Sequence, residues 1–363
     1  MVNLRIPGPT PCPPQVLEAM RKQMIDHRGK EFGQIMLQIT ARLKEFYQTK
    51  GDVLILTGSG TGSMEAAVAN TLSPGDKVLS ICNGTFGERF ADIAETFGAS
   101  VTRLRFELGK GAELAVVRKA LEADPSIQAV TITHNETSTG VTNDLESLSA
   151  VVKGFDKFLM VDAISSMGCI KLPMDAWGCD VVLSGSQKGW MVPPGLAFVG
   201  LSQRAWDAVA KAKMPRFYWD FKKAKSNAEK GQTPWTPAVP IFYALAVSLE
   251  LMAQEGLPNI LARHERVGKA AREGAKSLGL TLFADERYAS NTVTAINTPA
   301  GVDVDKLLAI LRDEYDTILA SSRGEMEVFR IGHLGFVTEE DIEKVIEALQ
   351  LALMSMGVIT CST

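Results

Sequence analysis

The feature that most constrains this chain is a repeated alternation between short apolar runs and stretches with helical spacing of apolar residues. Each run is rich in apolar or β-branched residues and ends in small or polar ones, as buried strands do. Strands that alternate with helices predict a largely parallel sheet with helices on both faces, an α/β fold. The seven expected strands lie at 53–57, 77–82, 101–104, 129–134, 158–163, 181–185 and 196–201.

The pattern changes after residue 255, where strands become short and helices long. The final stretch, "TEEDIEKVIEALQLAL", predicts an amphipathic helix, and Thr338 and Asp341 at its start fit a capping pattern. The elements expected before it are a helix around 258–278 and short strands near 280–283, 291–296 and 328–331.

Two domains are expected, because 363 residues exceed the size at which a single core usually stops growing. The first 14 residues carry five prolines and predict an extended arm, residues 1–14. Residues 15–255 hold the alternating pattern and form the expected large domain. Residues 256–363 form the expected smaller α+β domain.

Composition argues against several classes of partner. The net charge of −4 gives no sign of a nucleic-acid-binding surface or a basic membrane-binding face. No run approaches the roughly 18 apolar residues that a membrane span needs. The five cysteines form no C-x-x-C pair and fall largely in apolar segments, which suits reduced thiols, so we expect a cytoplasmic protein.

A glycine-rich turn, "LTGSGTGSMEAA", joins a predicted strand to a predicted helix at residues 56–67. Such a turn points backbone N–H groups and the positive end of the helix at an anion, usually a phosphate. The dinucleotide motif would need glycine where Ser63 stands, and the Walker motif is absent. Ser59, Gly60 and Thr61 therefore predict another kind of phosphate cup, with a tight turn that binds nothing as the alternative.

Two ionisable residues stand at the ends of predicted strands. Asp162 ends the run in "FLMVDAISSMG", and Lys188 follows the run in "VVLSGSQKGWMVPPG". Ligands of open α/β sheets bind at this edge. Considered separately, Asp162 could be a structural aspartate and Lys188 an ordinary surface lysine. Together, a phosphate cup, a buried carboxylate and a strand-end lysine are what pyridoxal 5'-phosphate (PLP) requires: a covalent anchor, a partner for the ring nitrogen and a grip on the phosphate.

Several motifs carry a family resemblance. "IPGPTPCPP", "THNETSTG", "VDAISSMG", "DVVLSGSQKGWMVPPG" and "FRIGHLG" follow one another along the chain in the order found in class V aminotransferases. The chain resembles their alanine–glyoxylate and serine–pyruvate branch over nearly its whole length. The resemblance implies the PLP-dependent transferase fold type I, a homodimer with active sites at the interface, and PLP attached to Lys188.

The resemblance also implies roles for further residues of this chain. Lys188 and Asp162 would be catalytic, and Arg330 would bind the substrate carboxylate with help from the arm at Gly8. Ser138 would lie near the ring hydroxyl and the substrate. The remaining cofactor contacts implied are Ser59, Gly60, Thr61 and Gln187 on the phosphate, Phe86 stacked on the ring, and Thr236 reaching the phosphate from the other subunit.

The chain also departs from the animal enzymes of that branch, which have histidine at Thr61, tryptophan at Phe86 and tyrosine at Thr233. A single evident carboxylate clamp, Arg330, favours small monocarboxylates. The expected activity is ping-pong transfer of an amino group from alanine or serine to glyoxylate or pyruvate. His134 is equally well explained as a core residue or a catalytic one, and the histidine spacing predicts no metal site.

Other readings stay open. Ureidoglycine–glyoxylate and phosphonate aminotransferases share the family, and a catalytically silent subunit could keep the fold, although it would be expected to lack Lys188 or Asp162. A cysteine desulfurase would need a cysteine before the Arg330 strand, where "TILASSRGEMEVF" offers only Ser321 and Ser322.

Overall fold

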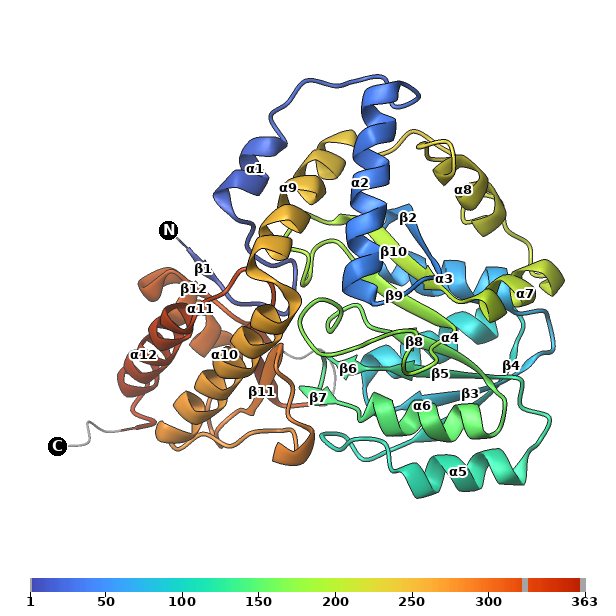
Figure 1. The fold of residues 1–363 in the computed structure, drawn as a ribbon. Coiled ribbons are helices and arrows are strands. Elements are labelled where there is room, and N and C mark those ends of the chain that lie inside the picture. Colours follow the sequence, from blue (N-terminus) through green and yellow to red (C-terminus); the bar gives the residue numbers. More distant parts are fainter. Residues whose placement is uncertain (1, 322–325, 360–363) are drawn as a thin grey trace.

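The computed structural model describes residues 2–321 and 326–359 (Figure 1). Its centre is a seven-stranded sheet of order β2-β10-β9-β8-β5-β3-β4. All neighbours are parallel except β10, which runs antiparallel to both β2 and β9. The predicted α/β fold with a mostly parallel seven-stranded sheet is therefore confirmed. The strands are β2 (Asp52–Gly58), β3 (Lys77–Cys82), β4 (Ser100–Arg105), β5 (Ala129–Thr133), β8 (Phe158–Asp162), β9 (Val181–Gly185) and β10 (Gly195–Leu201).

Helices cover both faces of this sheet, and strand residues alternate between two cores. Val53 and Ile55 of β2 face one core, while Leu54 and Leu56 face the other. The first core contains residues of α2 (Lys30–Tyr47), α5 (Leu114–Ala123), α6 (Leu145–Gly154) and α9 (Val239–Glu255). The second contains residues of α3 (Gly60–Thr71), α4 (Thr85–Thr96), α7 (Gln203–Lys211) and α8 (Phe221–Ala228).

The charged stretch "KKAK" at 222–225, whose composition favours a solvated loop, instead lies in helix α8. Asp220 caps the helix by accepting a hydrogen bond from the backbone N–H of Lys223. Phe221 and Ala224, three residues apart, are both buried against the second core. These two buried side chains anchor a mostly polar helix on the second core.

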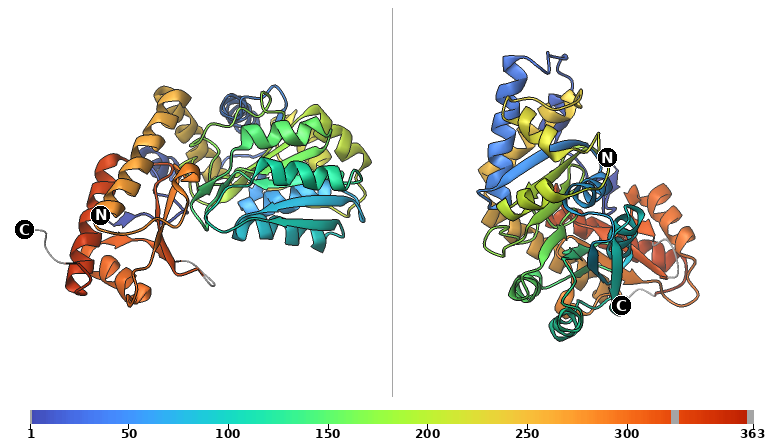
Figure 2. Two further views of the ribbon diagram at one scale, coloured as in Figure 1. Left: turned by 90° about the horizontal axis from the view of Figure 1, so that it is seen from below. Right: turned by 90° about the vertical axis from the view of Figure 1, so that its right-hand side faces the viewer.

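The C-terminal part packs around its own apolar core (Figure 2). A small antiparallel sheet has the order β11-β14-β13. The predicted long helix and the strands near 291–296 and 328–331 are present, but the stretch 280–283 makes only an isolated bridge from Leu282 to Ile296. Thr338 and Asp341 form the predicted capping box. The elements are α10 (Leu257–Ser277), η1 (Glu286–Tyr288), β11 (Val293–Asn297), α11 (Val304–Tyr315), β12 (Thr317–Ile318), β13 (Ala320–Ser321), β14 (Val328–Gly332) and α12 (Glu339–Ser355).

The N-terminal arm crosses between the two parts. Strand β1 (Asn3–Leu4) pairs in parallel with β12, and the backbone N–H of Gly332 donates to the Arg5 carbonyl. The chain then passes the end of β9, where the backbone N–H of Thr10 donates to the Gln187 carbonyl, before α1 (Pro14–Ala19) begins. The arm thus connects the C-terminal sheet to the carboxyl edge of the central one.

The carboxyl ends of the central parallel strands meet the first turns of α3 and α4 at one edge of the sheet. A short hairpin of β6 (Asn135–Glu136) and β7 (Val141–Thr142) follows β5 at the same edge. Strand ends, helix N-termini and the arm therefore converge in one region. Within the part of the chain that the structure describes, no helix is long and apolar enough to cross a membrane.

Candidate active site

The first turn of α3 forms one wall of the site. Ser59 is its N-cap, but the Ser59 side chain makes no capping hydrogen bond. A Cβ on Gly60 would lie 2.6 Å from the Cδ1 atom of Ile164, so the backbone approaches the loop after β8 as only glycine permits. The first amides of a helix have no partner within the helix and carry partial positive charge. This turn therefore presents donors suited to an oxyanion, as the predicted phosphate cup requires.

Gln187 borders the same turn from the end of β9. A Cβ placed on Gly185 would lie 3.1 Å from Gln187 Oε1 and 3.3 Å from the backbone nitrogen of Gly60, which puts these two groups close together. The Gln187 Oε1 atom is buried and has no hydrogen-bond partner. A buried acceptor without a partner is costly to a fold, and it marks a position where a bound molecule completes the hydrogen bonding.

Lys188 lies under the N-terminal arm. Its Nζ atom donates a hydrogen bond to the Pro7 carbonyl. The backbone N–H of Thr10 donates to the Gln187 carbonyl at 3.0 Å, and the Thr10 hydroxyl donates to the Lys188 carbonyl at 3.1 Å. Gly8, with φ of +130°, has no room for a side chain, since its Cβ would lie 2.6 Å from Nζ. Burial lowers the pKa of Lys188 to about 8.

Asp162 is buried at the end of β8. Its Oδ1 atom accepts a hydrogen bond from the backbone N–H of Ile164 at 2.9 Å. Burial raises the pKa of Asp162 to about 7, while that hydrogen bond and the positive charges of Lys188 and Arg89 act in the opposite direction. Conversely, the Asp162 carboxylate raises the pKa of Lys188. The two predicted catalytic residues therefore interact electrostatically within one site.

Glu136 of β6 is a buried carboxylate that contacts the first turn of α4, and the sequence did not single it out. It accepts hydrogen bonds from the backbone N–H groups of Phe86 at 3.0 Å and Gly87 at 3.1 Å. It also accepts from the Ser138 hydroxyl at 2.5 Å, and that hydroxyl in turn accepts from the backbone N–H of Thr85 at 3.0 Å. Glu136 therefore fixes the helix turn that carries Phe86, and the Ser138 hydroxyl is held within the same cluster.

Arg330 enters the site from the middle strand of the small sheet. It donates to the carbonyl oxygens of Thr137 at 3.3 Å and Ser321 at 2.7 Å. Its Nε atom is buried without a partner. The positive charge of Arg330 lowers the pKa of Lys188, which places the two cations in one electrostatic environment. With two of its five N–H donors used, the guanidinium keeps donors for a carboxylate.

Two further residues do not join this site within their own chain. Thr236 is exposed on the loop between α8 and α9, and among the described residues it makes no hydrogen bond to the site. His134 is buried behind the site, where its Nδ1 atom lies 3.0 Å from the Ser166 hydroxyl and burial lowers its pKa to about 4. The structure therefore favours the core interpretation of His134. Ser322, considered above, lies outside the described residues.

Comparison with known proteins gives the family. The sequence model of the family described as aminotransferase class-V matches residues 2–343 of this chain. The chain belongs to the class-V aminotransferases. The predicted family and the enzyme class, a transaminase, are thereby confirmed.

Two similar proteins and one similar crystal structure carry different functional names. The small subunit of a soluble hydrogenase from Synechococcus sp. (strain PCC 6716) is 44% identical over 360 residues, 98% of this chain and 93% of the relative. An L-aspartate–glyoxylate aminotransferase from Paracoccus denitrificans is 36% identical over 97% of this chain and 91% of its own length. The crystal structure of an alanine–glyoxylate aminotransferase from Nostoc sp. superposes with a TM-score of 0.93 at 32% identity, covering 97% of this chain and 95% of that one.

The hydrogenase name directs attention to possible metal ligands. No group of three or more His, Cys, Asp or Glu side chains arranged to hold a metal ion occurs among residues 2–321 and 326–359. Cys12, Cys82, Cys169 and Cys179 are free thiols, and burial raises the pKa of each.

Proposed function

We propose that the chain is a PLP-dependent aminotransferase that moves the amino group of a small amino acid, alanine or serine, to glyoxylate or pyruvate. The observation that carries the proposal is the meeting of Lys188, Asp162 and Arg330 beside an oxyanion-binding helix turn. The residues fit the cofactor: no side chain caps the first turn of α3, and the Gln187 amide, which borders that turn, carries N–H groups that can donate to a phosphate oxygen.

When bound, PLP supplies an electron sink for the bond that breaks at the substrate's α-carbon. Lys188 would hold the cofactor covalently, and its low pKa keeps much of the free amine neutral near pH 8. A neutral amine can accept the α-proton of the substrate and return it in the reverse half-reaction. Asp162 would hold a proton on the ring nitrogen, because a carboxylate favours a cation beside it.

Arg330 would position both substrates through their shared α-carboxylate. A guanidinium presents parallel N–H groups that match a carboxylate, and the unpartnered Nε is one such donor. The arm segment at Gly8 and Thr10 covers Lys188 and restricts water around its amine. One clamp that serves amino donor and keto acceptor in turn agrees with ping-pong exchange.

We further propose a homodimer in which Thr236 reaches the partner's cofactor phosphate. Its loop adjoins an exposed aromatic cluster, where Phe217 and Tyr218 are 69% and 46% exposed and both stack on Trp235. Exposed aromatic clusters of this kind favour an interface. The cytoplasmic location stays a prediction.

The test is a donor and acceptor panel on the PLP-loaded protein. Alanine, serine, aspartate, ureidoglycine and an aminophosphonate are each added alone, and the absorption band of the bound cofactor is followed before glyoxylate or pyruvate is supplied. Conversion by alanine or serine with recovery on glyoxylate supports the proposal, and Lys188→Ala is the control. If only aspartate, ureidoglycine or the phosphonate gives a response, that compound defines the substrate class, and alanine and serine are ruled out as donors. No response to any donor contradicts the aminotransferase proposal.

A further inference from the structure

Arg89 on α4 lies at the phosphate cup formed by the first turn of α3. Its NH1 group donates to the Thr61 hydroxyl at 3.3 Å, so α4 reaches across to the first turn of α3. The guanidinium carbon lies 4.6 Å from the centre of the Phe86 ring. The positive charge of Arg89 also contributes to the pKa values of Asp162 and Lys188. Arg89 therefore lies among the residues expected to surround the cofactor.

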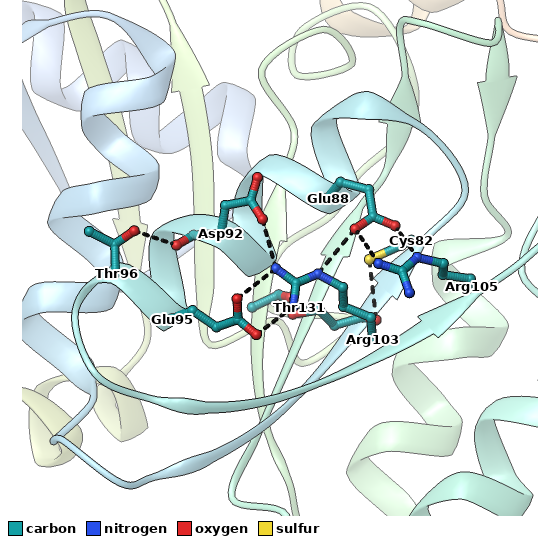
Figure 3. Close-up of polar contacts among 9 residues, drawn as sticks. Cys82, Glu88, Asp92, Glu95, Thr96, Arg103, Arg105 and Thr131 are labelled. Atoms are coloured by element: carbon teal, nitrogen blue, oxygen red, sulfur yellow. Dashed lines mark hydrogen bonds and ion pairs between the residues drawn. The ribbon is translucent and has the colours of Figure 1, made fainter. Parts of the chain in front are cut away.

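The other arginines near α4 are neutralised, and Arg89 is not. Figure 3 shows Arg103 in contact with Glu88, Asp92 and Glu95 of α4. Arg105 pairs with Glu88 at 2.7 Å. Within residues 2–321 and 326–359, Arg89 makes no ion pair with any carboxylate. The acidic side chains of α4 thus pair with arginines of β4, and Arg89, which contacts the cup at Thr61, has no carboxylate partner among the described residues.

The cup itself carries no charge to balance a phosphate. Ser59, Gly60, Thr61 and Gln187 are all neutral, and a phosphate monoester brings a charge of about −1.5 to −2 at pH 7. The helix N-terminus supplies only a partial positive charge. An arginine hydrogen-bonded to a cup residue and free of carboxylates is placed to supply the rest, through charge-assisted hydrogen bonds.

We propose that Arg89 binds the phosphate of the cofactor at the α3 N-terminus, as a further phosphate-binding residue of this site. The inference rests on the proposed function. The distal carboxylate of a dicarboxylic substrate offers the same oxyanion chemistry, but Arg89 contacts the cup at Thr61, whereas Arg330, the proposed carboxylate clamp, lies on β14 and contacts Thr137. The geometry therefore assigns the phosphate to Arg89.

The test measures cofactor binding to the cofactor-free protein, without catalysis. PLP and pyridoxal, which lacks the phosphate, are titrated separately into the parent, Arg89→Gln and Arg105→Gln. Arg105→Gln is the matched control, because it removes the same charge from an arginine that pairs with Glu88 outside the site. We expect Arg89→Gln to weaken PLP binding roughly 10- to 100-fold, the effect of a lost charged hydrogen bond, and to leave pyridoxal binding unchanged. Arg105→Gln should leave both unchanged.

Three results would overturn the assignment. Equal losses for PLP and pyridoxal in Arg89→Gln would mean that Arg89 only supports packing. Unchanged PLP binding would remove Arg89 from the phosphate. In a separate kinetic assay of the PLP-loaded Arg89→Gln protein, a rise in the apparent KM for aspartate but not for alanine would reassign Arg89 to the substrate. If Arg89→Gln fails to fold, Arg89→Lys keeps the charge and decides: PLP affinity within a few-fold of the parent supports the assignment, and a large loss refutes it. A parent protein that binds no PLP refutes the proposed function itself, a different outcome from a parent that binds PLP without need of Arg89.

Discussion

The titration of Lys188 in the cofactor-free protein is expected to depend on Asp162. Burial lowers the pKa of Lys188 from 10.5 to about 8, and the Asp162 carboxylate opposes this shift. With a pKa of 8, about half of the amine is neutral at pH 8, against roughly 0.3% for a lysine at 10.5. The neutral amine is the nucleophile, so the reactive fraction of Lys188 at pH 8 should be about 150-fold larger than that of an ordinary lysine. Removal of the opposing charge in Asp162→Asn should lower the pKa of Lys188 further.

Competitive labelling with acetic anhydride, read out by peptide mass spectrometry from pH 6 to 11, measures this directly. Lys110 is the internal comparison, because its exposed ion pair with Glu107 raises its pKa. The parent should show a midpoint near 8 for Lys188, and Asp162→Asn should move it toward lower pH. A midpoint at or above 10 in the parent, or a shift to higher pH in the variant, would refute the electrostatic coupling of the two residues.

Four substitutions test separate parts of the site in the PLP-loaded protein. Asp162→Asn should reduce turnover about 100-fold or more while the protein keeps its PLP, since one charged group at the reacting system is lost; near-normal turnover would remove this role. Arg330→Lys should raise the apparent KM of donor and acceptor alike, about tenfold, because lysine lacks the parallel donors; unchanged values for both would rule the clamp out. Gly8→Ala should lower turnover at least tenfold, because the added Cβ would lie 2.6 Å from Lys188 Nζ. Wild-type kinetics would show that the arm moves aside without affecting Lys188. Thr236→Val should loosen PLP about tenfold in the dimer; a monomer with full cofactor and activity would contradict a shared site.

The central sheet was predictable because its signal is local. Each strand alternates between two apolar cores, as Val53 and Leu54 do, and each run ends where a loop begins. The pairing of β1 with β12 has no such signal, since Asn3 meets Thr317 far away in the sequence. Helix α8 was missed for a related reason: Phe221 and Ala224 define its buried face only once the second core exists to receive them.

The site was predictable to the extent that its residues stand at strand ends. Lys188 and Asp162 do so, and the fold brings them together. Glu136 also follows a strand, in "THNETSTG", and that position is the signal that could have indicated it. Arg89 lies within a helix among charged residues, where the sequence does not distinguish an arginine that faces the site from Arg103, which pairs with three carboxylates.

The most direct test of the central claim is to locate the cofactor on the chain. The purified protein is incubated with PLP, reduced with sodium borohydride, digested and mapped by mass spectrometry, with Lys188→Ala treated in parallel. We expect one modified lysine, Lys188, and no corresponding adduct in the variant. Modification at another lysine, or an adduct of equal yield in Lys188→Ala, would contradict it.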